Sequence, residues 1–383
     1  MIGRLARPVG NAVLALALLL APYIDAEVAS RISTWNVNVP LADLLALVAL
    51  CWMVVGQIPA GPKSTILQRI PEALGWAGLW AVGLAAAHNG DGLVGSGPSG
   101  LHTLLRKPVF LCLAWRVGVS GLVAGAGPRF TVRWVRVTAL LCAAILTASS
   151  VSRIGAGEAF WWQAIAGLTN NHKTLAVFLA PTLPLIWGQP VVVAVVLVAL
   201  LLSWSKAALV TGALAAGWMV LPGRWRTRVL GSAAALGLLG MAVLPWLASS
   251  PEQIDSMRSR MSLNKRALEM FLAHPWIGYG AGSNVRYEVS TYPDYRVNGV
   301  DAHGVFAKLL SEFGVLGTGA WLLATGALLG LFWRRARGTR GLDDAILGSF
   351  LALHLNLLTS TETFSQTHWA ILGVLCGLSA RRR

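Results

Sequence analysis

The sequence has little charge, and acidic residues are the scarcest part of it. Only 12% of its 383 residues are charged, whereas about 25% are charged in an ordinary soluble domain. Asp and Glu number 16 against 31 Lys and Arg, which leaves a formal net charge of +15. The low charged fraction argues against a soluble globular protein, and the excess of cations must be explained by where they lie.

Cysteine is also scarce, and its spacing excludes a cysteine-based metal site. The cysteines are Cys51, Cys112, Cys142 and Cys376. Each lies by itself in an apolar run, without the close pairs that bind zinc or iron. We interpret all of them as small hydrophobic residues.

Long apolar runs recur from end to end, and 55% of the residues are hydrophobic. Runs of about 20 residues cross a hydrocarbon core of about 30 Å as helices. Backbone groups in lipid must be satisfied internally, which leaves helices or closed barrels, and continuous runs select helices. We therefore predict an all-α polytopic membrane protein with about 12 transmembrane helices. The predicted spans are 8–24, 40–58, 73–88, 103–123, 133–150, 172–187, 190–203, 205–221, 228–247, 304–333, 342–359 and 364–380.

These spans divide the chain into three parts. Residues 1–247 hold transmembrane helices 1–9, and residues 304–383 hold helices 10–12. Between them, residues 248–303 form one large periplasmic loop that carries amphipathic helices and most of the polar residues of interest.

Cations cluster beside the apolar runs. Positively charged loops stay in the cytoplasm, so the clusters place both termini on the cytoplasmic side and explain much of the charge without nucleic acid as a partner. The clusters are Arg4 and Arg7; Lys63 and Arg69; Arg129, Arg133 and Arg136; Arg224, Arg226 and Arg228; Arg334, Arg335, Arg337 and Arg340; and Arg381–Arg383.

Several charged residues on the predicted outer side are open to more than one interpretation. Asp25 and Glu27 could hold a divalent metal or mark the exit from the membrane, and we expect no metal. Arg106 lies where the fourth predicted span begins. A cation there either contacts a polar cavity or extends its charged end to the membrane interface. Arg153 precedes an aromatic stretch that is typical of an outer interfacial helix.

Two predicted helix starts carry candidate anion contacts. Asn171, His172 and Lys173 open the sixth span, where free N–H groups and the helix dipole favour an anion or a sugar; the same residues would also serve as a plain helix cap. Lys206, in the tight hairpin at residues 203–206, is either an end charge that reaches the interface or a cation directed at a phosphate.

The periplasmic loop begins with a helical pattern over residues 251–273. Such a helix either rests on the outer leaflet with a solvated basic face or clamps a polyanionic headgroup, since Arg binds phosphate oxygens through parallel bonds and Lys acts as a point charge. The polar face comprises Arg258, Lys265 and Glu269, and the apolar stripe comprises Leu263, Ala267 and Met270 or Phe271.

The same loop ends at a histidine. The run Gly278-x-Gly280-x-Gly282 follows no predicted strand, so it does not fit a dinucleotide-binding loop; its glycines permit a tight turn and close backbone approach. His303 lies where the loop re-enters a helix, beside Asp301. An isolated histidine is commonly structural, but next to a basic loop its imidazole suits a general base for a sugar hydroxyl.

A set of residues spread over the second half of the chain resembles the O-antigen ligase/polymerase superfamily of bacterial inner-membrane glycosyltransferases. The set comprises Arg266, His274-Pro275, Gly278-x-Gly280, His303, Leu309, Glu312-x-Gly314 and Gly317, preceded by Asn170–Lys173 and Ser205-Lys206. The resemblance covers residues 168–317 and implies a GT-C-like architecture. Two positions depart from it: Lys206 stands where members often have Arg, and Gly304 stands where Asn is common.

The resemblance implies glycan transfer at the periplasmic face without metal, cofactor or nucleotide sugar. The donor would be O-antigen on undecaprenyl diphosphate, and the acceptor a hydroxyl of the lipid A-core. His303 would deprotonate that hydroxyl for one inverting displacement, while Arg266 and Lys206 stabilise the departing diphosphate. The predicted substrate-binding residues are Asn171, His172, Lys173, Arg106, Arg153, Arg258 and Lys265.

Within the superfamily, the modest length and the single large outer loop, with no soluble C-terminal domain, favour an O-antigen ligase. An O-antigen polymerase would use the same donor with a lipid-linked glycan as acceptor, and protein-glycosylating members tend to be longer. A solute transporter would need polar residues or broken helices at the membrane midplane, and it would leave His303 without a task.

Overall fold

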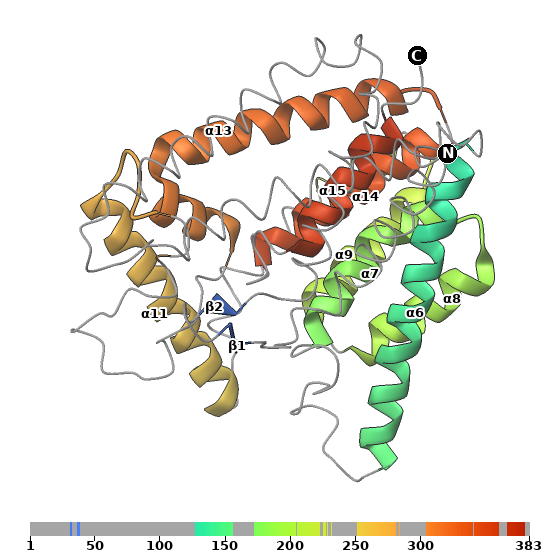
Figure 1. The fold of residues 1–383 in the computed structure, drawn as a ribbon, viewed down its shortest axis with the longest axis horizontal. Helices are drawn as coiled ribbons and strands as arrows, with labels where there is room; N and C mark the ends of the chain where they lie inside the picture. The colour runs from blue at the N-terminus through green and yellow to red at the C-terminus, as the bar shows by residue number, and fades with distance from the viewer. Residues whose placement is uncertain are drawn as a thin grey trace.

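The computed structural model describes residues 31–32, 37–38, 127–155, 172–203, 205–222, 225–226, 228, 231, 251–280, 283, 304–339, 341–359 and 366–379. Helices dominate these ranges, as predicted (Figure 1). The helices are α6 (Gly127–Gly155), α7 (His172–Ile186), α8 (Pro190–Leu202), α9 (Lys206–Val220), α11 (Pro251–Ala273), α13 (Val305–Ala336), α14 (Leu342–Thr359) and α15 (Gln366–Ser379).

One small hairpin departs from the all-α prediction. β1 (Arg31–Ile32) pairs antiparallel with β2 (Val37–Asn38), and the β-branched residues Ile32 and Val37 lie opposite each other. Such side chains favour extended backbone. The hairpin lies in the predicted first outer loop, so it adds a local feature without changing the helical architecture.

Predicted and observed helix bounds agree closely for α7, α8, α9, α14 and α15, and α11 has the bounds predicted for the helix over residues 251–273. α6 extends beyond the predicted span at 133–150 in both directions. Arg129 therefore lies on α6 rather than before it, and Arg153 lies on α6 rather than on a separate interfacial helix. The predicted spans at 8–24, 40–58, 73–88 and 103–123, and nearly all of 228–247, lie outside the described residues.

Length and apolar composition together separate α13 from the other described helices. Among the described residues, α13 is the helix that is long and apolar enough to cross a membrane. α8 and α9 are apolar but shorter, with 13 and 15 residues, and α8 is only about 20 Å long at 1.5 Å per residue. Neither reaches the thickness of about 30 Å that a full crossing needs, so the number of twelve crossings stays a prediction.

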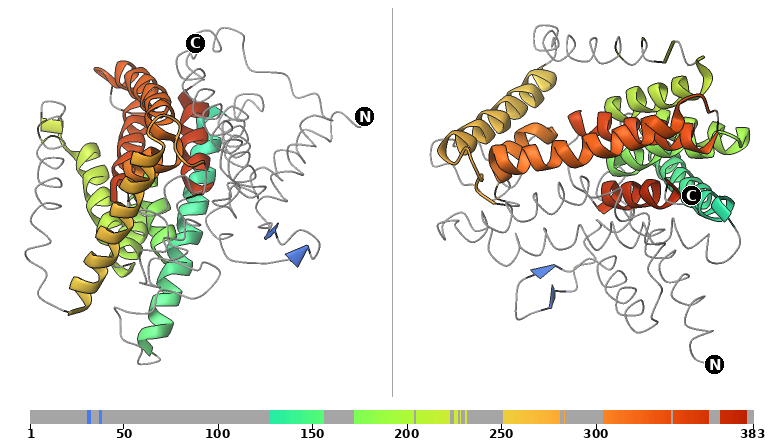
Figure 2. Two further views of the ribbon diagram at one scale, coloured as in Figure 1. Left: turned by 90° about the vertical axis from the view of Figure 1, so that its left-hand side faces the viewer. Right: turned by 90° about the horizontal axis from the view of Figure 1, so that it is seen from above.

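α7 and α14 form the centre of the packed helices. α14 contacts α7, α9, α13 and α15, and α7 also contacts α6 and α9. The core between them is made of aliphatic and aromatic side chains, including Leu183, Phe350 and Trp369. α11 stands apart from this group and packs on α13, which it crosses near the start of that helix (Figures 1 and 2).

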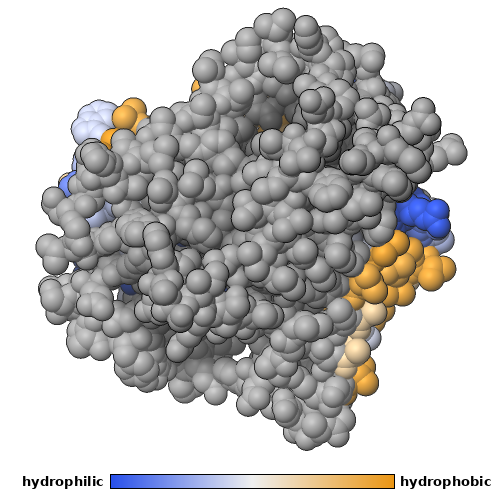
Figure 3. All heavy atoms as spheres, viewed as in Figure 1, coloured by the Kyte–Doolittle hydropathy of each residue, from blue (hydrophilic) through white to orange (hydrophobic). Residues whose placement is uncertain are grey.

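Large apolar side chains also lie on the surface. On α8, Val191 is 75% exposed and Leu201 is 59% exposed, and hydrophobic atoms gather on the side of the molecule where α8 lies (Figure 3). An apolar surface of this kind marks contact with a membrane or another protein, which agrees with the predicted membrane location.

Contacts between helix ends define two ends of the bundle. A β-carbon on Gly304 would lie 3.0 Å from the carbonyl oxygen of Leu358, so the start of α13 adjoins the end of α14. Trp218 near the end of α9 bonds to Asp344 at the start of α14. α9 and α13 therefore begin at one end, here called the Gly304 end, and the opposite end is called the Asp344 end. The short turns before and after α8 reverse the chain twice, so α7 also begins at the Gly304 end.

Candidate functional site

The helix that follows His303 is broken at Gly314. This residue has φ 61° and ψ −164° inside α13, so the N–H groups and carbonyls around it cannot make the usual bonds between residues four apart. Residues 274–280 supply the missing partners. The bonds run from the N–H groups of Tyr279, Gly280, Val315 and Leu316 to the carbonyl oxygens of Ser311, Glu312, Pro275 and Trp276 respectively, at 2.9, 2.8, 2.8 and 3.1 Å. We call residues 274–280 together with residues 311–316 the clasp.

Two glycines make the clasp possible. Gly278 has φ 70°, and a β-carbon there would lie 2.4 Å from the carbonyl carbon of Glu312. A β-carbon on Gly314 would lie 2.5 Å from the carbonyl oxygen of Trp276. Both positions also require positive φ, which side chains disfavour. The sequence predicted that Gly278 permits another backbone segment to approach closely. The structure confirms this, and the neighbouring backbone is that of Glu312 and Phe313.

Arg266 is buried in the part of α11 that packs toward α13. Only 1% of it is exposed, and it is among the largest fully buried side chains of the described residues. It shares its helix face with Leu263, Ala267 and Met270, all buried, which confirms the predicted apolar stripe. A guanidinium held in protein rather than in water is fixed before any substrate charge develops.

Lys265 lies on the other side of the helix and is solvent-exposed. Its Nζ is 3.9 Å from Oε1 of Glu269, one turn along the exposed face. Exposed pairs of this kind contribute about 0.3–0.5 kcal/mol. The structure therefore separates the two neighbouring cations: Arg266 is directed into the protein and Lys265 away from it. Arg258 lies on the same helix, nearer its start.

A second buried charged group lies at the clasp. Nζ of Lys308 is 3.2 Å from Oε1 of Glu312, and both side chains are almost fully buried. Glu312 belongs to the superfamily pattern noted in the sequence, but its pairing with Lys308 was not predicted. Their spacing of four residues on a helix was the available signal.

The start of α13 is fixed by Gly304, the residue after His303. Gly304 has φ 100° and a β-carbon there would crowd the carbonyl oxygen of Leu358. Gly304, which stands where Asn is common in the superfamily that the sequence resembles, thus has a backbone conformation suited to glycine. His303 itself lies outside the described residues, as do Asn171, Arg106, Asp25 and Glu27.

Other predicted site residues lie at helix starts. Lys206 is the first residue of α9, and the hydroxyl of Ser205 before it accepts a bond from the N–H of Ala208 at 3.5 Å. His172 and Lys173 are the first residues of α7. Since α7, α9 and α13 all begin at the Gly304 end, Lys206, His172, Lys173 and the residue after His303 belong to the same end of the bundle. Arg153 lies near the end of α6 rather than at a helix start.

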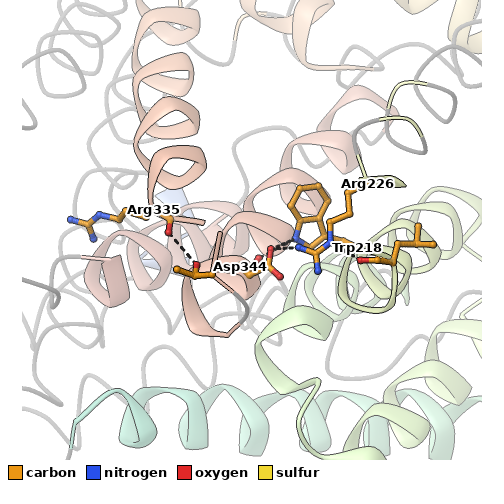
Figure 4. Close-up of polar contacts among 6 residues, drawn as sticks. Trp218, Arg226, Arg335 and Asp344 are labelled. Atoms are coloured by element: carbon orange, nitrogen blue, oxygen red, sulfur yellow. Dashed lines mark hydrogen bonds and ion pairs between the residues drawn. The ribbon is translucent and has the colours of Figure 1, made fainter. Parts of the chain in front are cut away.

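A polar cluster at the Asp344 end was missed by the sequence analysis, which explained its arginine by membrane topology alone. Asp344 accepts hydrogen bonds from Nη1 of Arg226 and, at 3.0 Å, from Nε1 of Trp218 (Figure 4). The Arg226 guanidinium also lies 5.0 Å from the centre of the Trp218 indole, within the range of a cation–π contact. This cluster joins α9 to α14, far from the clasp, and we interpret it as structural.

A neighbouring contact closes the same end. Arg335, in the last turn of α13, donates hydrogen bonds to the backbone carbonyl and the hydroxyl of Ser379 at the end of α15. Arg226, which follows α9, and Arg335, at the end of α13, therefore lie at the same end of the bundle, and the cytoplasmic location of that end stays a prediction. Within the described part of the chain, no group of three or more His, Cys, Asp or Glu residues could hold a metal ion.

Comparison with curated proteins gives no match. Comparison with protein families gives one, to the family described as O-antigen ligase, over residues 190–322. The matched segment contains α8, α9, α11, the whole clasp and the first half of α13. It also contains Arg266, Lys206 and Gly304, together with the position of His303. Residues 190–322, about a third of the chain, are thus similar to the O-antigen ligase family, in agreement with the resemblance seen in the sequence.

Proposed function

We propose that this protein is an O-antigen ligase of the bacterial inner membrane. It transfers polysaccharide from undecaprenyl diphosphate to a hydroxyl of the lipid A-core at the periplasmic face. The family match supports an enzyme of O-antigen synthesis in general. The donor, the acceptor, about twelve GT-C-like transmembrane helices and cytoplasmic termini are our proposal.

The observation that carries the proposal is the clasp. It ties α11, which bears the buried Arg266, to α13, whose first residues follow His303 directly. Positioning of reacting groups by a rigid scaffold is a large part of catalysis, because a shift of about 1 Å can cost on the order of a hundredfold in rate. A base and a cation on two separately mobile segments would lack this fixed relation.

In the proposed mechanism, His303 takes the proton from the acceptor hydroxyl as its oxygen attacks the anomeric carbon. The bond between that carbon and the diphosphate oxygen breaks in the same step, which inverts the configuration. Arg266 and Lys206 stabilise the negative charge that develops on the leaving diphosphate. Asn171, His172, Lys173, Arg106, Arg153, Arg258 and Lys265 complete the proposed substrate-binding set, and no metal or cofactor takes part.

Burial supports unequal roles for the two neighbouring cations on α11. Arg266 is inside the protein, where electrostatic interactions are stronger than in water, whereas Lys265 is exposed and already paired with Glu269. We therefore assign diphosphate stabilisation to Arg266 and only initial attraction of the anionic donor to Lys265.

The position of the break in α13 argues against a solute transporter. The part of α13 after Gly314 is about 33 Å long at 1.5 Å per residue, which is enough to cross a membrane without the preceding turns. The break thus belongs at the membrane surface and not at the midplane, where transporter sites are built.

Lipopolysaccharide from a deletion strain tests the proposal and separates it from an O-antigen polymerase. A ligase predicts an intact core without any attached O-antigen, together with accumulated lipid-linked polymer. A single repeat left on the core would instead indicate a polymerase.

Complementation with variants of α11 tests the proposed site. Arg266→Lys keeps the positive charge but loses the paired N–H groups, and we expect it to restore O-antigen capping poorly. Arg260→Ala, an exposed position on the same helix, is the matched control and should restore capping fully. Equal capping by both variants at equal expression would remove Arg266 from the site.

A further inference from the structure

α11 has a second apolar face, opposite the one that packs on the protein. We call it the outer stripe: it consists of Met261, Leu268 and Leu272 on α11 and of Trp276 in the turn that follows, between 54% and 66% exposed. At about 100° per residue, the first three lie half a turn away from Leu263 and Met270. A helix bordered by water carries polar residues opposite its packed face, so this second apolar face indicates an apolar partner.

The outer stripe continues onto α13. The clasp bonds join Pro275 to Val315 and Trp276 to Leu316, and the side chains of Val315 and Leu316 are exposed in turn, at 45% and 51%. Further along α13, Leu322 and Leu323 are also about half exposed. Among the described helices, α13 is the one that is long and apolar enough to cross a membrane. The outer stripe therefore extends the surface that α13 would present to lipid.

The orientation of α11 and the residues beside the stripe fit a membrane surface. α11 lies across the start of α13 rather than along it (Figures 1 and 2), as expected for a helix parallel to the membrane plane. Lys265 and Glu269 border the stripe, where a lysine can place its aliphatic part against acyl chains and its ammonium among phosphates. Trp276 lies at the junction with α13, and Trp is enriched at membrane interfaces.

We propose that α11 is held between α13 and the outer leaflet of the membrane, with the outer stripe inserted among phospholipid acyl chains. This inference rests on the proposed membrane location but not on the proposed reaction. It reverses the simplest sequence interpretation, because the apolar stripe of Leu263, Ala267 and Met270 packs on protein and the opposite face contacts lipid. Arg266 is then held at the depth of the lipid phosphate groups.

The test uses the full-length protein in vesicles of phosphatidylethanolamine and phosphatidylglycerol. In a background without the native cysteines, single cysteines at positions 268 and 272 are labelled with a nitroxide. Position 260, exposed and about 80–120° away around the same helix, serves as the control. Electron paramagnetic resonance then measures collisions with oxygen, which partitions into lipid, and with a water-soluble nickel chelate.

We expect the ratio of oxygen to nickel collisions to be several-fold higher at positions 268 and 272 than at position 260. Equal ratios at all three positions would show that the stripe faces water and would overturn the proposal. Low collision rates with both reagents at 268 and 272 would show that protein covers the stripe and would also overturn it. A glycan-transfer assay on the same samples reports on the reaction separately, so either proposal can fail without the other.

Discussion

A single added methyl group at Gly278 should damage the clasp. In Gly278→Ala, the new β-carbon would lie 2.4 Å from the carbonyl carbon of Glu312 and 2.5 Å from the nitrogen of Phe313. Both are backbone atoms, so no side chain can rotate away. Positive φ at an alanine costs about 1–2 kcal/mol, and overpacking costs about 1–3 kcal/mol. Together these predict a loss of about 2–5 kcal/mol from the free energy of unfolding, if the backbone does not shift.

The matched control is Gly319→Ala on α13. A β-carbon there meets nothing within 4 Å, and alanine is the better helix former by about 1 kcal/mol. Thermal unfolding of the purified protein in detergent, followed by tryptophan fluorescence, should show a lower melting temperature for Gly278→Ala and an unchanged or higher one for Gly319→Ala. Equal melting temperatures for the two variants would refute the close backbone packing on which the clasp depends.

Three further substitutions test other parts of the structure. Arg226→Ala leaves the buried Asp344 carboxylate with only the Trp218 indole as a described donor. This substitution should lower the free energy of unfolding by about 3 kcal/mol, measured by the same thermal unfolding. An unchanged melting temperature would contradict the expectation. Gly348→Ala places a β-carbon 2.6 Å from Cδ1 of Trp218 and should cost about 1–3 kcal/mol, with a blue or red shift of tryptophan emission as the indole moves. Gly304 has φ 100°, so Gly304→Ala should displace the start of α13 and lower the rate of glycan transfer on the order of ten- to a hundredfold. A wild-type rate would show that this turn does not position the catalytic residues.

The helices were predictable because their signal is local. Pro190 marks the start of α8, Ser203 and Ser205 mark the hairpin between α8 and α9, and Gly338 follows α13. Each of these residues ends an apolar run, so the ends of the helices can be predicted without reference to the rest of the chain. α6 was predicted too short because residues 127–132 and 151–155 lie outside the apolar run at 133–150, although they continue the helix that buries Ala139 and Cys142.

The clasp could be predicted only in part. The glycine run within the periplasmic loop indicated close backbone approach. Its partner, the break at Gly314, lies on another helix, and no local pattern connects the two. Burial of Arg266 left a clearer signal, since it falls between Leu263 and Met270 on the apolar side of α11. The pairing of Arg226 with Asp344 joins residues 118 positions apart and follows only from the packing of α9 on α14.

Transfer by the purified protein tests the central claim most directly. The reaction contains lipid-linked O-antigen and lipid A-core in vesicles, with a chelator and without nucleotide sugar. The account predicts that the wild type forms O-antigen-capped lipid A-core and that His303→Ala, at equal folding, forms none. Capping by His303→Ala at the wild-type rate would contradict the mechanism, and conversion of the donor into longer lipid-linked polymer without capping would contradict the assignment as a ligase.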